Sequence, residues 1–151
     1  MEMTGSRQLR ASTDAVWQRL NDAETLKSCI PGCTELTGSP EEGFEATVVQ
    51  KVGPVKATFK GKVTLSDIVA GKSYTITGEG SGGVAGYAKG GANVSLAPGD
   101  EGGTELTYTV NANVGGKIAQ LGSRLIDGFA RKLADQFFEN FQAAVEPPEV
   151  P

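Results

Sequence analysis

The stretch that decides the fold reads KIAQLGSRLIDGFARKLADQFFENFQAA and runs from Lys117 to Ala144. Apolar residues recur in it every three or four positions, the spacing that places side chains on one face of a helix. These residues are Ile118, Leu121, Leu125, Phe129, Leu133, Phe137 and Phe141. At about 1.5 Å per residue, such a helix is roughly 40 Å long. The stretch therefore predicts one long amphipathic helix whose apolar stripe the rest of the chain must cover.

The residues before this helix read almost wholly as strands, which form the only large surface that can cover it. Residues 55–66 alternate strictly between apolar and polar side chains, the period of a strand with one buried and one wet face. Short connections between successive strands indicate an antiparallel meander. The other predicted strands are 3–10, 44–51, 74–80, 94–96 and 106–114.

Two short helices are predicted between the first strand and the meander. Ser12 or Thr13 offers an N-cap for the first helix, and the second starts at Asp22 or Ala23. The predicted fold class is therefore α+β, with a curved antiparallel sheet wrapped around the long C-terminal helix.

Composition indicates a globular chain with no nucleic-acid partner. The chain has 151 residues and a net charge of −4, so no basic face for nucleic acid is expected. Residues 1–146 are expected to form one ligand-binding domain, and the proline-rich residues 147–151 read as a linker-like tail. The N-terminus does not resemble a signal peptide, and no apolar run is long enough to span a bilayer. We expect a cytoplasmic protein, with peripheral contact at the inner membrane face left open.

Motifs for catalysis and metal binding are scarce. The chain has no histidine, which removes Ser-His-Asp and Cys-His catalysis, and two cysteines alone cannot complete a tetrahedral zinc site. No catalytic residue and no metal site are therefore predicted. Cys29 and Cys33 are either free thiols in a turn or a reversible disulfide. Residues 78–83 match G-x-G-x-x-G, but a dinucleotide site needs a helix after this pattern, and a strand follows here.

Small residues gather on the predicted inner face of the sheet. Ten of the 21 glycines fall between Gly78 and Gly103. Glycine in strands permits bends and close approach, so either strong curvature or an unfilled, ligand-sized cavity explains them. Tyr74 and Tyr108 share the parity of the buried residues on their strands. They are either core tyrosines whose hydroxyls reach solvent or backbone, or cavity tyrosines that donate to a ligand carbonyl.

Basic residues repeat along the predicted helix. Lys117, Arg124 and Arg131 are spaced by seven and lie beside or opposite the apolar stripe. They form either a solvated face or a short stripe that meets an anionic surface. A second cluster with the same two interpretations is Lys56, Lys60 and Lys62.

Two segments resemble one known family. Residues 16–22, Val-Trp-Gln-Arg-Leu-Asn-Asp, and residues 26–33, Leu-Lys-Ser-Cys-Ile-Pro-Gly-Cys, are similar to its V-W-x-x-L-x-D … L-x-x-C-I-P-G pattern. Residues 116–126 resemble the start of the long helix in the same family. This is the CoxG family, named for the G subunit of carbon monoxide dehydrogenase, in the START-like (SRPBCC) superfamily. The resemblance covers nearly the whole chain and implies the helix-grip fold.

The resemblance also implies a role. Members of the family accompany molybdenum-containing carbon monoxide dehydrogenases and related hydroxylases, and they are linked to attaching the enzyme to the membrane, where electrons enter the quinone pool. The chain is therefore expected to be a non-catalytic accessory protein that binds a lipophilic ligand, with an isoprenoid quinone as the specific guess. No tightly bound cofactor is expected. One alternative is a cyclase- or dehydratase-type enzyme that uses the same cavity as its active site. Another is a protein adaptor with a filled core.

The predicted ligand-binding residues lie on the inner face of the sheet and on the first half of the helix. In this prediction the second half of the helix, from Phe129 to Phe141, is structural, and Phe129 at its start also contacts the ligand. The ligand-binding residues are Phe59, Tyr74, Ile76, Tyr108, Ile118, Leu121, Leu125 and Phe129.

Overall fold

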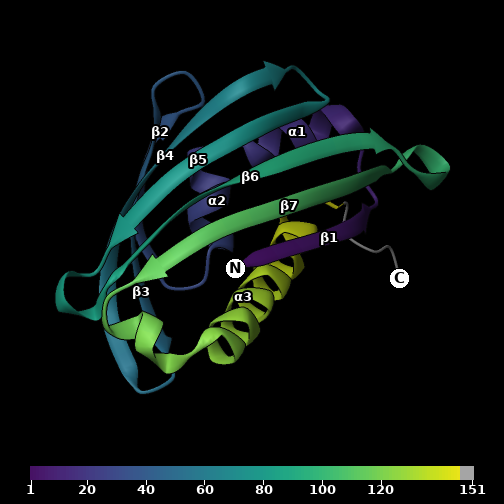
Figure 1. Cartoon of the computed structure of the whole chain (residues 1–151). Helices are drawn as coiled ribbons and strands as arrows, with labels where there is room; N and C mark the ends of the chain where they lie inside the picture. The colour runs from purple at the N-terminus through teal and green to yellow at the C-terminus, as the bar shows by residue number, and fades with distance from the viewer. Residues whose placement is uncertain (147–151) are drawn as a thin grey trace.

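The computed structural model describes residues 1–146, and the predicted tail 147–151 lies outside them. Within the described part, seven strands form one antiparallel sheet in the order β1-β7-β6-β5-β4-β3-β2 (Figure 1). The strands are β1 (Glu2–Leu9), β2 (Cys33–Ser39), β3 (Gly43–Val52), β4 (Val55–Val69), β5 (Ser73–Ser81), β6 (Tyr87–Pro98) and β7 (Thr104–Gly115).

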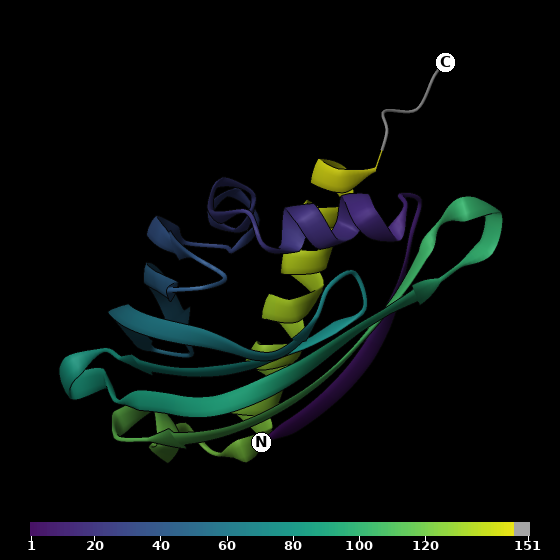
Figure 2. The ribbon, with the colours of Figure 1, turned by 90° about the horizontal axis from the view of Figure 1, so that it is seen from above.

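The α-helices all lie on the concave side of the sheet, as Figure 2 shows. They are α1 (Thr13–Leu20), α2 (Ala23–Cys29) and α3 (Ser123–Val145). Short 3₁₀ turns interrupt three connections; these are η1 (Gly83–Ala85), η2 (Asp100–Gly102) and η3 (Lys117–Leu121). The predicted α+β class and helix-grip architecture are confirmed.

The two short helices begin where the sequence predicts them. The Ser12 hydroxyl accepts a hydrogen bond from the Ala15 N–H at 3.2 Å, which caps α1. The Asp22 carboxylate accepts from the Thr25 N–H at 3.2 Å and caps α2 in the same way. Both caps satisfy backbone donors that a helix start leaves unpaired.

The long helix begins later than predicted. Lys117–Leu121 forms the separate turn η3, and α3 starts only at Ser123. Gly116 at φ +78° and Gly122 at φ +93° bracket η3. This left-handed backbone cannot continue an α-helix. The prediction of one unbroken helix from Lys117 to Ala144 is therefore wrong, and α3 is about 35 Å long.

The strand parities follow the predicted alternation, but one strand was missed. On β4 the residues alternate between half-buried and exposed from Val55 to Ser66. On β6, Tyr87 has the opposite parity to the buried residues Val94 and Leu96 and is 53% exposed. Strand β2, from Cys33 to Ser39, pairs with β3 and forms one edge of the sheet. Its burial does not alternate, so periodicity could not reveal it.

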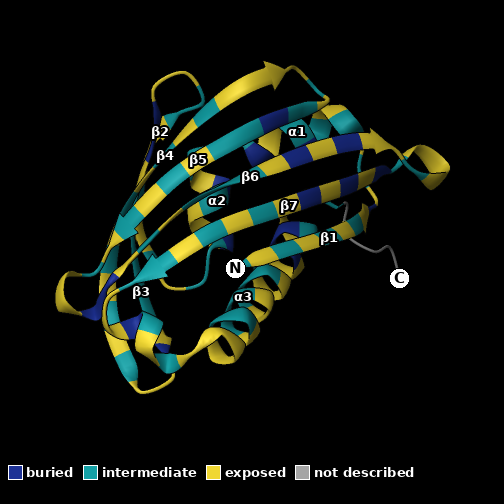
Figure 3. Cartoon of the chain, in the orientation of Figure 1, coloured by how far each residue is buried: buried dark blue, intermediate teal, exposed yellow. Residues whose placement is uncertain are grey.

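The packed core sits at the end of the sheet nearest α1. Figure 3 shows the buried positions of β5, β6 and β7 gathered toward that helix. Phe138 and Phe141 of α3 pack into the same cluster, and Phe141 is fully buried. Trp17 of α1 meets the ring of Tyr74 edge-on, with 5.3 Å between ring centroids. The other end of the sheet, beside η1 and η3, therefore has fewer buried positions to hold it.

Candidate ligand cavity under the long helix

A cavity of about 440 Å³ lies between α3 and the concave face of the sheet. Its volume falls within the range of small-molecule sites, about 300–1,000 Å³. The sheet contributes a floor that includes Val63, Leu65, Ile76, Ala92 and Val110. From α3, Ala130, Leu133, Ala134, Phe137 and Phe138 form the opposite wall, and Leu26, Ile30 and Pro31 close one side.

The lining is almost wholly apolar. Among the described residues that line the cavity there is no Asp, Glu, Lys or Arg, and Tyr74 and Tyr108 bring its side-chain hydroxyls. Burial raises the pKa of Tyr74 above its ordinary value, so its phenol stays neutral and can donate a hydrogen bond. Such a space suits an uncharged, lipophilic molecule.

Tyr108 holds a position that depends on a glycine. Its ring stacks on Phe138, with 5.1 Å between centroids and 20° between the ring planes. The ring also extends across Gly5 on β1, where a Cβ would lie 2.4 Å from the Tyr108 hydroxyl oxygen. Glycine at position 5 therefore leaves the room that the tyrosine occupies.

Of the eight predicted site residues, Tyr74, Ile76 and Tyr108 line this cavity. Phe59 instead packs on Gly82, where a Cβ would lie 2.7 Å from the phenylalanine ring. The remaining four also lie outside the lining, toward or beyond the N-terminal end of α3. They are Ile118, Leu121, Leu125 and Phe129.

The cavity faces the half of the helix that the sequence assigned to structure. Leu121 and Leu125 lie against Gly53 at the tip of the β3–β4 hairpin, within 3.7 Å and 3.4 Å of a Cβ built there. They therefore close the end of the sheet and do not face the central space. No sequence signal pointed to Ala130 and Ala134, whose small side chains leave much of the volume open.

Hydrogen bonds hold the segment from Cys29 to Cys33 in place at one side of the cavity. The Asn140 amide of α3 donates to the Cys29 carbonyl at 3.0 Å, and the Val49 N–H donates to the Gly32 carbonyl at 2.9 Å. These bonds hold Ile30 and Pro31 against the cavity. Both cysteines are free thiols, and burial raises the pKa of each. Neither thiol is therefore poised as a nucleophile.

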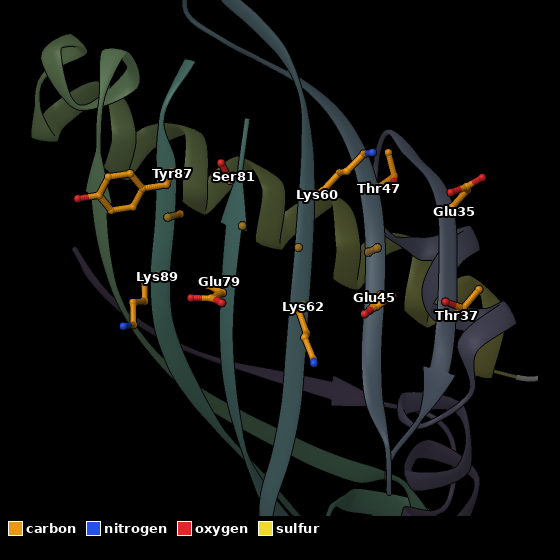
Figure 4. Close-up of a pocket in the computed structure, with 14 residues that line it drawn as sticks. Glu35, Thr37, Glu45, Thr47, Lys60, Lys62, Glu79, Ser81, Tyr87 and Lys89 are labelled. Carbon is orange, nitrogen blue, oxygen red and sulfur yellow. The ribbon is translucent and has the colours of Figure 1, made fainter. Parts of the chain in front are cut away.

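A larger hollow of about 840 Å³ lies on the outer face of the sheet (Figure 4). A row of alternating charges crosses it, because oppositely charged residues lie directly opposite each other on neighbouring strands. Along this row Glu45 lies opposite Lys62, Lys62 opposite Glu79, and Glu79 opposite Lys89. Three glutamates and three lysines line this hollow, so it has no net charge to select a ligand. We interpret it as the solvated face of a twisted sheet despite its larger volume.

Metal ligands and membrane-spanning helices also bear on function. No group of three or more His, Cys, Asp or Glu side chains within residues 1–146 is placed to hold a metal ion. No helix in the same range has the length and apolar character that crossing a membrane requires.

Known structures share this fold. A conserved protein from Geobacillus kaustophilus is 31% identical, with a TM-score of 0.89 over 96% of this chain and 95% of that chain. A START superfamily protein from Mycobacterium smegmatis is 13% identical, with a TM-score of 0.70 over 95% and 96% of the two chains. A protein from Thermus thermophilus is 14% identical, with a TM-score of 0.69 over 96% and 97%. The last two show the fold alone.

The sequence itself identifies the family. The comparison with curated proteins found no match. The model of the CoxG family, which describes the G subunit of carbon monoxide dehydrogenase, matches residues 5–146, which span the described sheet and all three α-helices. The chain therefore belongs to the CoxG family of carbon monoxide dehydrogenase subunits.

Proposed function

We propose that this protein is a non-catalytic accessory protein of a molybdenum-containing carbon monoxide dehydrogenase or a related hydroxylase, and that it binds a lipophilic ligand. The family and the START-like fold indicate an accessory, ligand-binding role. The observation that carries the proposal is the apolar cavity of about 440 Å³ under α3. Our specific candidate for the ligand is an isoprenoid quinone, because it combines an apolar tail with carbonyl oxygens that a tyrosine hydroxyl can address.

Ligand extraction and titration test this proposal. Lipids are extracted from the protein after expression and purification, identified by mass spectrometry, and the emptied protein is titrated with a short-tailed quinone. Ala92→Phe fills the cavity from β6, and Ala97→Phe places the same ring on the exposed face of the same strand. Quinone binding is expected in the wild type and in Ala97→Phe, and to fall at least about tenfold in Ala92→Phe.

Two results would contradict the ligand proposal. One is the absence of any stoichiometric prenyl lipid together with no quinone binding on titration. The other is equal binding by Ala92→Phe and Ala97→Phe, which would place the ligand elsewhere. The rival cyclase or dehydratase function requires an ionisable group that faces the substrate, and the described cavity lining contains only the two tyrosines.

We further propose that one end of the molecule contacts an anionic lipid surface. Three connections meet at this end in Figure 1: the β3–β4 hairpin, η1, and the η3 turn that leads into α3. They present exposed cations, which are Lys51, Lys56, Lys117 and Arg124. Val84 is 92% exposed and Leu125 is 38% exposed beside them. We call these six residues the cationic end.

Charge complementarity supports this partner. Residues 51–56, 82–86 and 115–125 contain no acidic residue, although the whole chain carries a net charge of −4. Lys51 and Lys56 are direct cross-strand partners, an arrangement that like charges disfavour. No ion pair involves any of the four cations in the part of the chain that the structure describes. Anionic head groups would relieve this repulsion and are worth about 1 kcal/mol for each cation at the surface.

Sedimentation with lipid vesicles tests the cationic end. We expect binding to vesicles that contain phosphatidylglycerol and little binding to pure phosphatidylcholine. Reversal of two charges, Lys56→Glu with Lys117→Glu, is expected to weaken binding more than tenfold. The matched control is the double variant Lys62→Glu with Lys89→Glu, which changes the net charge by the same amount but on the outer face of the sheet. It is expected to bind the phosphatidylglycerol vesicles more tightly than the Lys56→Glu, Lys117→Glu variant does. Equal loss in both pairs would show that only net charge matters and would contradict a defined surface.

A further inference from the structure

A second, smaller pocket adjoins the apolar cavity between the edge strand β1 and α3. It has a volume of about 210 Å³ and shares Met3 and Tyr108 with the cavity. Three charged side chains also line it, Arg7 from β1 and Arg131 and Asp135 from α3, together with the β1 residues Thr4, Gly5 and Ser6. We call this pocket the polar annex. Because Met3 and Tyr108 line both spaces, the annex lies directly beside the cavity.

Arg7 brings an unused donor to the annex. Its Nη2 pairs with the Asp135 carboxylate, and its guanidinium lies over the Phe138 ring, with Cζ 5.3 Å from the ring centroid. Its Nε is buried and has no hydrogen-bond partner within the described residues. Buried donors in proteins nearly always have an acceptor, and leaving one unpaired is unfavourable. An acceptor oxygen in the annex would remove this cost once the Arg7 side chain turns to bring its Nε to the pocket.

Phe138 connects Arg7 to the cavity. The same ring that lies under the Arg7 guanidinium stacks on Tyr108 and lines the cavity. Tyr108 extends across Gly5 toward β1, the side on which the annex lies. The tyrosine hydroxyl and the Arg7 Nε are therefore donors at the boundary between an apolar space and a polar one.

The charges of the annex favour an acceptor over a donor. Arg7 and Arg131 contribute two positive charges and Asp135 one negative charge, which leaves a net charge of about +1. The Asp135 carboxylate is already paired with Arg7. An ammonium head group would face two arginines with no free acid, whereas a carbonyl or carboxylate oxygen would meet guanidinium and phenol donors.

We propose that the polar annex binds the head group of an amphiphile whose apolar tail lies in the cavity, and that this head group presents an acceptor oxygen. A quinone carbonyl and a fatty-acid carboxylate share this chemistry. The inference rests on the proposed lipophilic-ligand function and adds the residues that choose the head group. Arg7, Arg131 and Tyr108 then determine specificity, while the cavity supplies most of the binding surface.

Displacement of an apolar fluorescent dye tests the preference with probes of one tail length. The probes are a fatty acid, the corresponding primary amine, the corresponding alkane, and a short-tailed naphthoquinone. In the wild type, the acid or the quinone is expected to bind at least about tenfold more tightly than the amine. Whichever of the two binds better identifies the source of the acceptor oxygen.

Variants separate head-group recognition from folding. Arg7→Lys keeps the charge but removes the Nε donor, and is expected to weaken binding of the preferred probe by about 10- to 100-fold. Alkane binding is expected to stay unchanged. The matched control is Lys132→Met, which removes an exposed cation beside Arg131 that does not line the annex. If Arg7→Lys fails to fold, Tyr108→Phe removes only a hydroxyl and is expected to weaken the same probe by about 2- to 10-fold.

Each contrary result has a distinct meaning. Equal binding of acid, amine and alkane by the wild type would overturn the annex proposal and leave the cavity function standing. Loss of alkane binding in Arg7→Lys, in parallel with the acid, would show a structural role and would also overturn it. Failure of the wild type to bind any of the probes would overturn both proposals.

Discussion

Gly83 and Gly86 lie in one connection, between β5 and β6, but only Gly86 is crowded. Gly86 has φ +125°, and a Cβ there would lie 2.2 Å from the Gly115 carbonyl oxygen. Gly83 has φ +63° with nothing within 4 Å of a Cβ. Gly83→Ala is expected to lower the free energy of unfolding by about 1–2 kcal/mol, because alanine disfavours the left-handed backbone. Gly86→Ala is expected to cost clearly more, because the crowding atom belongs to the backbone. Urea unfolding measures both, and equal losses would contradict this explanation.

Asp22 couples the start of α2 to pH. Its Oδ2 accepts hydrogen bonds from the Thr25 hydroxyl at 2.6 Å and from the Thr25 N–H at 3.2 Å. These bonds, the hydroxyl first, lower the pKa of Asp22 below its ordinary value of 3.8. Because the folded pKa is the lower one, the stabilisation is fully present above the ordinary value and is lost as pH falls through the folded value.

Asp22→Asn tests this coupling, since asparagine still caps a helix but does not titrate. Urea midpoints measured from about pH 5 downward are expected to fall less steeply in the variant than in the wild type. An NMR titration of the Asp22 carboxyl gives the folded pKa directly. Identical acid dependence of the two proteins would contradict the coupling.

At the scale of elements, α3 is anchored by its C-terminal half. Phe141 is fully buried, whereas Leu125 near the N-terminus is 38% exposed. Phe141→Ala is expected to lower the free energy of unfolding by about 3–5 kcal/mol, and Leu125→Ala by less than about 1 kcal/mol. The first turn of α3 has no side-chain cap, so its amides are expected to exchange with solvent fastest in the helix. Equal losses in the two variants, or uniform exchange along α3, would contradict this gradient.

Elements with a clear period could be predicted, and the others could not. The apolar stripe of α3 and the alternation of β4 follow from side-chain geometry alone. Periodicity does not reveal the break at Gly122, because a glycine does not interrupt a spacing of three and four, although its φ of +93° separates η3 from α3. Strand β2 was missed because it is an edge strand whose exposure does not alternate.

At the scale of the whole molecule, the sequence leaves open whether the small inner-face residues mean a curved sheet or a cavity, and it does not say where a cavity lies. Parity predicts that Tyr74, Ile76 and Tyr108 face inward, and all three line the cavity. Parity tells which face of the sheet a residue is on, but it does not tell at which point along the sheet the helix and the sheet enclose a cavity. That depends on where Leu125 meets the β3–β4 hairpin and where Phe138 meets β7, which are contacts between distant parts of the chain.

Stability and binding together test whether this space is open in the folded protein. Ala134 lines the cavity, and Ala143 lies exposed on the same helix, so replacement by leucine changes helix propensity equally at both positions. If the space is open, Ala134→Leu is expected to be more stable than Ala143→Leu by about 0.5–2 kcal/mol, because it fills a void. If the core is already filled, the added leucine would overpack it, and Ala134→Leu would lower the free energy of unfolding by about 1–3 kcal/mol.

The same two variants also separate the ligand-binding function from a purely structural one. Thermal unfolding gives their stabilities, and dye displacement gives their affinities for a short-tailed quinone. A more stable Ala134→Leu that binds more weakly than Ala143→Leu is expected, because only an open cavity couples the two measurements in opposite directions. A less stable Ala134→Leu with unchanged affinity would indicate a filled core, and the protein would then act through its surface as an adaptor between other proteins.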